Sequence, residues 1–145
     1  MLLHIQNQAA FLTFLTAGFP AKDDTPELLM ALERGGADVI ELGMPFSDPQ
    51  ADGPAIQESN RIALQQGVDY AMCLKYIKEA RSRGLKVPVV LMGYYNPIMA
   101  YGEERAVHDA KSAGANGFIL VDLLPEEAGT FLNACRREKM AFVPL

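Results

Sequence analysis

The chain has 145 residues, half of them hydrophobic, and a formal net charge of −5 from 13 basic and 18 acidic side chains. This length suits one domain with its own apolar core, and the composition excludes disordered and fibrous classes. The charges are spread along the chain, so no basic stripe can follow a phosphate backbone and we expect no nucleic-acid partner.

Apolar runs and turn residues predict strands that alternate with helices. In chain order the pattern predicts a strand over 11–16, a helix over 25–35, a strand over 38–43, helices over 56–66 and 70–83, a strand over 87–93, a helix over 103–113, a strand over 117–121, a helix from Pro125 and a strand over 140–145. Uninterrupted apolar strands in strict alternation with helices indicate a parallel sheet covered by helices.

Two architectures have this pattern, an open doubly wound sheet and a (β/α)8 barrel. No GxGxxG motif follows any predicted strand. A closed barrel needs eight strands and typically about 250 residues. We therefore expect residues 1–145 to form either an open sheet or an incomplete barrel domain of about five β/α units. The exposed edges of such a sheet predict poor solubility of the isolated chain.

Several sequence features indicate the cellular compartment. Residues 1–10 lack Lys and Arg and do not resemble a signal peptide, and the longest apolar runs are too short to span a bilayer, so we expect a cytoplasmic protein. Cys73 and Cys135 fall in helical patterns without metal-ligand spacing, which predicts reduced packing thiols and no metal site. His4 and His108 are predicted to be surface residues without partners.

The most informative segment covers residues 40–54, because it places a carboxylate within an apolar strand. Strand alternation puts Val39, Glu41 and Gly43 on one face. In a barrel Glu41 would point inward at the carboxyl-terminal mouth, where barrel active sites lie and where it could give and take a proton. The alternative is a structural Glu that is paired with a neighbouring Lys or Arg, and both interpretations stay open.

The loop after this strand supplies further carboxylates. Asp52 lies in the turn signal ADGP, where Asp commonly hydrogen-bonds its own backbone, and Asp48 in SDP has the same ambiguity. Prolines stiffen this loop, as a preorganised site requires. Asp122, just past the fourth strand, could cap the helix predicted from Pro125.

Aromatic residues are expected at the same mouth. Tyr94 and Asn96, in YYNP after the third strand, supply aromatic surface and an amide, although aromatic residues there could equally plug the barrel end. Phe14 and Thr16, near the end of the first strand, would face the same mouth, although a strand Phe is by default a core residue.

With these residues in place, the chain resembles the α subunit of tryptophan synthase. The motifs that carry the resemblance are ELGMPFSDP (41–49), ADGP (51–54), TAG (16–18), LMGYYNP (91–97) and VDL (121–123). The segments YGEER (101–105) and AGANGF (113–118) are similar to the fungal form of the family, in which α and β domains are fused. The resemblance covers almost the whole chain.

The resemblance implies retro-aldol cleavage of indole-3-glycerol phosphate to indole and glyceraldehyde 3-phosphate, without a cofactor in the α reaction. Glu41 would be the acid/base that protonates the ring carbon bearing the side chain. Asp52 would hold the indole N–H and stabilise the positive charge that develops there.

The same resemblance assigns two further groups of residues. Phe14 and Tyr94 match positions that line the indole pocket. Pro45, Asp48 and Asn96 match the face that docks the β subunit or a fused β domain, which carries pyridoxal phosphate.

The chain also departs from the family pattern. Gln50 stands where an aliphatic residue is usual, and Leu124 where a proline is usual. The family holds phosphate with loops after strands seven and eight, which five strands do not include. A fragment that keeps the acid/base pair and at most docks to the β partner is therefore one alternative. Another is a different phosphate-substrate barrel such as indole-3-glycerol phosphate synthase, which is less favoured because no predicted strand here ends in Lys.

Overall fold

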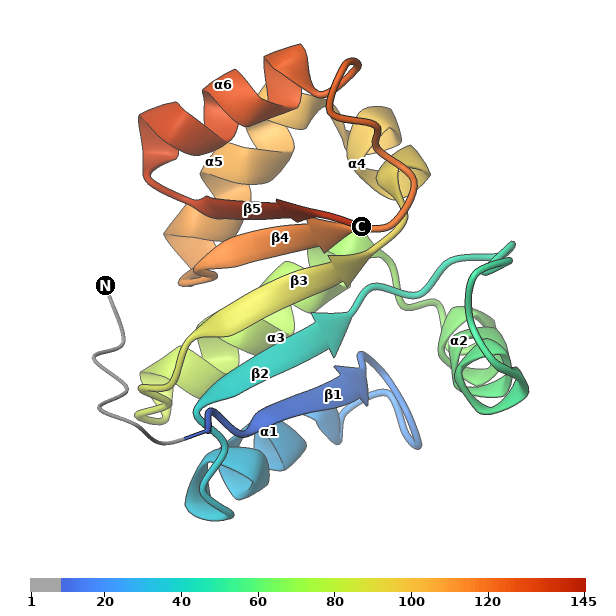
Figure 1. The fold of residues 1–145 in the computed structure, drawn as a ribbon. Coiled ribbons are helices and arrows are strands. Elements are labelled where there is room, and N and C mark those ends of the chain that lie inside the picture. The colour runs from blue at the N-terminus through green and yellow to red at the C-terminus, as the bar shows by residue number, and fades with distance from the viewer. Residues whose placement is uncertain (1–8) are drawn as a thin grey trace.

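Five parallel strands form one sheet in the order in which they occur in the chain (Figure 1). The computed structural model describes residues 9–145, so His4 and most of the segment tested for a signal peptide lie outside the described residues. The strands are β1 (Leu12–Thr16), β2 (Val39–Gly43), β3 (Val89–Gly93), β4 (Gly117–Leu120) and β5 (Ala141–Pro144). All four neighbouring pairs are parallel, as the sequence pattern predicted.

The helices show which of the two architectures is present. They are α1 (Thr25–Arg34), α2 (Pro54–Gln65), α3 (Tyr70–Ser82), α4 (Tyr95–Tyr101), α5 (Glu103–Ala113) and α6 (Gly129–Glu138). Helices α1, α3, α5 and α6 lie on one side of the sheet, and α2 lies beyond the carboxyl end of β2 (Figure 1). A doubly wound sheet carries helices on both faces and reverses its strand order, so this sheet is an arc of a β/α barrel.

Two predictions about helices were wrong. Helix α4 follows Tyr94 directly in a segment for which no helix was predicted, and Pro97 fits there because it lies in the first turn, whose N–H groups have no partner within the helix. Helix α6 begins at Gly129 instead of Pro125. The intervening residues form a turn closed by the Glu127 N–H, which donates to the Leu124 carbonyl over 2.9 Å.

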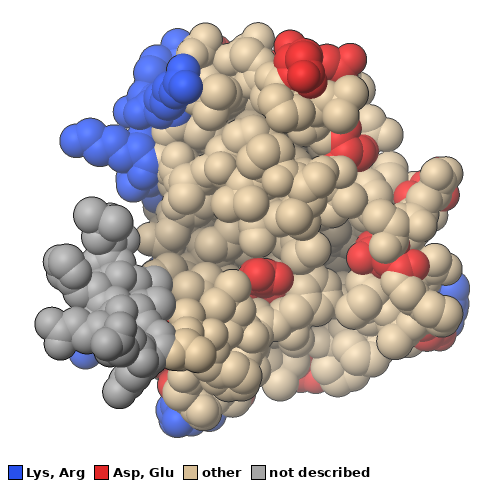
Figure 2. Space-filling view, viewed as in Figure 1, with Lys and Arg blue, Asp and Glu red and all other residues tan. Residues whose placement is uncertain are grey.

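The two faces of the sheet differ in burial. Ile40 and Leu42 face the helices and are fully buried, together with core residues from β3 and β4. On the opposite face, Leu12, Phe14 and Val143 remain 51%, 39% and 46% exposed. Figure 2 shows that most of this face is uncharged. One row of paired residues crosses the sheet at the level of Glu41: Phe14, Glu41, Val90, Gly117 and Ala141.

The amino ends of three strands are joined through Asn116. Its side-chain oxygen accepts from the Val89 N–H over 2.9 Å, its own N–H donates to the Val89 carbonyl over 2.8 Å, and its carbonyl accepts from the Ala141 N–H over 3.0 Å. β3, β4 and β5 are thereby held in register at this end.

The guanidinium of Arg81, near the end of α3, braces this junction. It donates to the carbonyls of Leu85 and Val87 over 2.8 Å each, to the Gly114 carbonyl over 3.1 Å and to the Asn116 side chain over 2.9 Å. One half-buried cation therefore satisfies acceptors from two different loops.

The two cysteines are buried, as expected of packing residues, and the histidine prediction is partly wrong. Cys73 and Cys135 are buried free thiols, and burial raises the pKa of Cys135 to about 12. His108 is exposed as expected, but its Nδ1 lies 3.1 Å from a carboxylate oxygen of Glu138. Within residues 9–145 no helix is long and apolar enough to cross a membrane, and no cluster of three or more His, Cys, Asp or Glu could hold a metal ion.

We predict that Arg81→Lys lowers the free energy of unfolding by about 2–3 kcal/mol, because an ammonium keeps the charge but cannot replace the planar set of donors. Urea denaturation measures this loss. Arg83→Lys is the matched control, since Arg83 lies two residues away, is exposed and pairs with the surface carboxylates of Glu27 and Glu79. It should cost less than about 1 kcal/mol. Equal losses in both variants would contradict the bracing role of Arg81.

Candidate active site

The candidate acid/base, Glu41, lies on the uncovered face of β2. Its register partner on β1 is Phe14, and both residues are partly exposed. Among residues 9–145 the Glu41 carboxylate has no hydrogen bond or ion pair, so the structural alternative, a Glu paired with Lys or Arg, is not what these residues form.

Asp52 lies in the loop between β2 and α2, and its carboxylate contacts a residue from the next strand. Its Oδ2 accepts a hydrogen bond of 3.2 Å from the Tyr94 hydroxyl. The backbone of Asp52 is held separately, because its N–H donates to the Pro49 carbonyl over 3.1 Å and its carbonyl accepts from Gln57 over 2.9 Å. The carboxylate is thus directed to Tyr94 instead of to its own turn.

Tyr94 is the residue that joins the two loops. Its hydroxyl also accepts from the Ala51 N–H over 2.9 Å, and its ring stacks on Phe46 with centroids 5.0 Å apart. Only 7% of Tyr94 is exposed. Burial is the largest cause that raises the pKa of Tyr94; the charge of Asp52 adds to it and the Ala51 hydrogen bond opposes it.

Polar residues on the buried side of α2 bond the loop after β2 and the end of β1. The Asn60 side-chain oxygen accepts from the Phe46 N–H over 3.1 Å, and the hydroxyls of Ser59 and Thr16 lie 2.7 Å apart. The sequence prediction included Thr16 but missed Ser59 and Asn60. Their signal is a polar pair on the apolar face of a helix, which burial permits only where both side chains find partners.

A small cavity brings together three of the predicted site residues, Phe14, Asp52 and Tyr94. Its volume is about 20 Å³, enough for roughly one water molecule. Glu41 does not line it and lies beside it in the Phe14 row. Gly43 makes this packing possible, because a Cβ there would lie 2.6 Å from the Phe14 ring.

The residues predicted to dock a partner do not all lie on one exposed surface. Asp48 and Asn96 are exposed and line one hollow of about 360 Å³ together with Tyr94. Pro45 is buried and does not line it. Asp122 lines the same hollow, and the prediction that it caps a helix at Pro125 was wrong: its carboxylate accepts from the Tyr95 N–H over 2.6 Å and caps α4.

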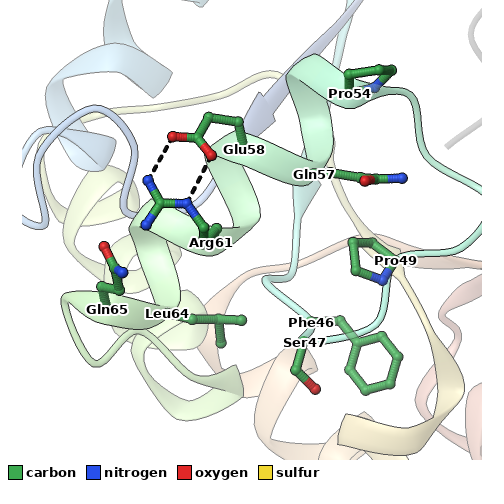
Figure 3. A pocket seen from close by; sticks show the side chains of 9 residues that line it. All are labelled: Phe46, Ser47, Pro49, Pro54, Gln57, Glu58, Arg61, Leu64 and Gln65. Atoms are coloured by element: carbon green, nitrogen blue, oxygen red, sulfur yellow. Dashed lines mark hydrogen bonds and ion pairs between the residues drawn. The ribbon is translucent and has the colours of Figure 1, made fainter.

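A larger hollow of about 650 Å³ lies between the loop after β2 and helix α2 (Figure 3). The charged residues that line it, Glu58 and Arg61, pair with each other through two hydrogen bonds of 2.7 and 2.6 Å. None of Phe14, Glu41, Asp52 and Tyr94 borders it. We therefore place the candidate active site in the smaller cavity.

Comparisons with known proteins show the family of this chain. A family model described as tryptophan synthase alpha chain matches residues 2–145. The chain belongs to this family. The tryptophan synthase of Saccharomyces cerevisiae is 54% identical over 140 residues, and the alpha chain of Geotalea uraniireducens is 52% identical over 133 residues.

Solved structures of the family have the same fold. The alpha subunit from Legionella pneumophila str. Paris superposes with a TM-score of 0.90 at 39% identity, and tryptophan synthase from M. tuberculosis with 0.89 at 33%. The shared part covers 93% and 95% of this chain, and 52% and 55% of theirs. The fold is therefore that of the family's β/α barrel.

The family relationship extends over only part of each relative. The matches cover 97% of this chain but 20% of the Saccharomyces protein, and 92% of this chain but 49% of the Geotalea alpha chain. The chain thus spans about half the length of the curated alpha chains that it matches. The assignment to indole-3-glycerol phosphate synthase is not supported by these matches.

We predict that Gly43→Ala displaces the Phe14 ring and lowers the free energy of unfolding by about 1 kcal/mol, the lower end of the cost of overpacking, since Phe14 is partly exposed and can move. The ring resonances of Phe14 and a urea titration report the two effects. Gly53→Ala is the control, because Gly53 has φ −74° and nothing within 4 Å of an added Cβ. An unshifted Phe14 ring in Gly43→Ala would contradict the proposed close packing.

Proposed function

We propose that the chain carries the acid/base part of a lyase of tryptophan biosynthesis, which cleaves indole-3-glycerol phosphate to indole and glyceraldehyde 3-phosphate. The observation that carries the proposal is the pairing of Asp52 with Tyr94 in a cavity beside Phe14, with Glu41 next to Phe14 in register. The family assignment supports the same reaction.

The proposed chemistry divides between two carboxyl groups. Glu41 gives a proton to the indole ring carbon that bears the glycerol side chain, and the ring nitrogen then carries the positive charge. Asp52 accepts a hydrogen bond from that N–H and stabilises this charge. The Glu41 carboxylate next takes the proton of the adjacent side-chain hydroxyl, the carbon–carbon bond breaks, and its electron pair restores the aromatic ring.

No cofactor is needed for this reaction, since a retro-aldol cleavage is completed by proton transfers alone. Pyridoxal phosphate belongs in our proposal to the β partner, either a separate subunit or a fused domain. The exposed hollow with Asp48 and Asn96 supports docking at the face that the family resemblance assigns to that partner. We expect the protein to act in the cytoplasm.

A binding role without catalysis is the second candidate. The uncovered face of the sheet favours it, because Leu12 and Val143 remain about half exposed there and Glu41 is only partly enclosed. Acid/base groups lose much of their advantage when water reaches them. In that case the chain would dock to the β partner and release no indole.

We predict that Glu41→Gln lowers kcat for indole release by about 10²–10⁴-fold, the usual contribution of a positioned acid/base. Indole release from indole-3-glycerol phosphate by the purified chain, with and without β subunit, measures this. Glu126→Gln is the control for loss of one negative charge, because Glu126 is exposed in the turn before α6. Release that survives in Glu41→Gln would refute the assigned role, and binding to β subunit without release would establish the second candidate.

A further inference from the structure

The hydroxyl of Tyr94 has a geometry that fixes the direction of its only proton. A tyrosine hydroxyl has one donor and accepts through its lone pairs. The Ala51 N–H donates to it over 2.9 Å, and the Asp52 carboxylate, 3.2 Å away, offers only acceptors. The hydroxyl proton therefore points to Oδ2 of Asp52.

Tyr94 is held by its own ring and through its two neighbours in the chain. Its ring stacks on Phe46 at an interplanar angle of 29°. The next N–H in the chain, that of Tyr95, donates to the Asp122 carboxylate over 2.6 Å. On the strand side, the Val121 N–H donates to the Gly93 carbonyl over 3.0 Å. The segments after β2, β3 and β4 thus meet around Tyr94 and its two chain neighbours.

We propose that the Tyr94 hydroxyl is a positioning group for Asp52: it holds Oδ2, leaves Oδ1 free for the indole N–H, and pins the turn through Ala51. This inference rests on the proposed function. It adds to the expected role of Tyr94, which is to line the indole pocket, a second role in orienting the Asp52 carboxylate. A phenylalanine would line the pocket equally well but could not orient the carboxylate.

The first test reads the contact without catalysis. In Tyr94→Phe the amide of Ala51 loses its acceptor, and its hydrogen exchange, followed by NMR, should be about fivefold faster, the factor expected for one hydrogen bond of ordinary strength. Tyr95→Phe is the matched control, because the same ring type is altered one residue away while the Ala51 contact remains. Unchanged exchange at Ala51 would overturn the proposal.

A second test covers the case in which Tyr94→Phe fails to fold. Asp52→Asn removes the charge that helps to raise the pKa of Tyr94, so the ¹³Cζ resonance of Tyr94 should titrate at lower pH than in the parent chain. Asp48→Asn is the control, since Asp48 in the same loop bonds Gln50 instead. Identical titration of Tyr94 in the parent chain and in Asp52→Asn would overturn the proposal.

The catalytic test separates this inference from the proposed function. In a chain whose indole release depends on Glu41, Tyr94→Phe should lower kcat by about tenfold or more with a smaller change in KM, because Asp52 acts on charge that develops in the transition state. Unchanged kcat would reject the positioning role while the function stands. Absence of Glu41-dependent release would refute the function and with it the positioning role, even if the Ala51 and Tyr94 signals shift as expected.

Discussion

The rest of the structure depends on the guanidinium of Arg81. Parallel strands leave their amino ends as a row of loops, and the backbone groups of these loops need partners when they are partly buried. Arg81 supplies donors to three carbonyls and to Asn116, which itself joins β3, β4 and β5. The register held at this end determines which residues of β3, β4 and β5 lie level with one another, among them Val90, Gly117 and Ala141.

The carboxyl end of the sheet is organised by negative groups instead. Asp52 and Asp122 each accept a hydrogen bond from the segment after β3. Asp52 accepts from the Tyr94 hydroxyl, and Asp122 accepts from the Tyr95 N–H. Two adjacent residues therefore tie three loops together. The two ends use opposite charges for the same purpose, and Glu41, the candidate acid/base, is part of neither network.

The sequence predicted the features that follow from local pattern. The five strands and the face on which Glu41 lies were correct because strand alternation has a period of two and β2 is short. Helix α4 was missed because its seven residues begin with a Tyr-Tyr-Asn-Pro segment that is typical of a loop. The predicted partner of Asp122 was wrong because its carboxylate accepts from an N–H that lies 27 residues earlier in the chain. The contact between Asp52 and Tyr94, 42 residues apart, follows only from the fold, since no local pattern encodes which loops meet.

The small volume beside Phe14 has a consequence for how a ligand would enter. A cavity of about 20 Å³ cannot hold a bicyclic ring, so the walls must separate first. Phe14 is the wall with no helix behind it, and two of the other lining residues, Met44 and Met92, have flexible, polarisable side chains. Opening therefore proceeds toward the uncovered face, and the measured affinity of any aromatic ligand includes the free energy of swinging Phe14 aside.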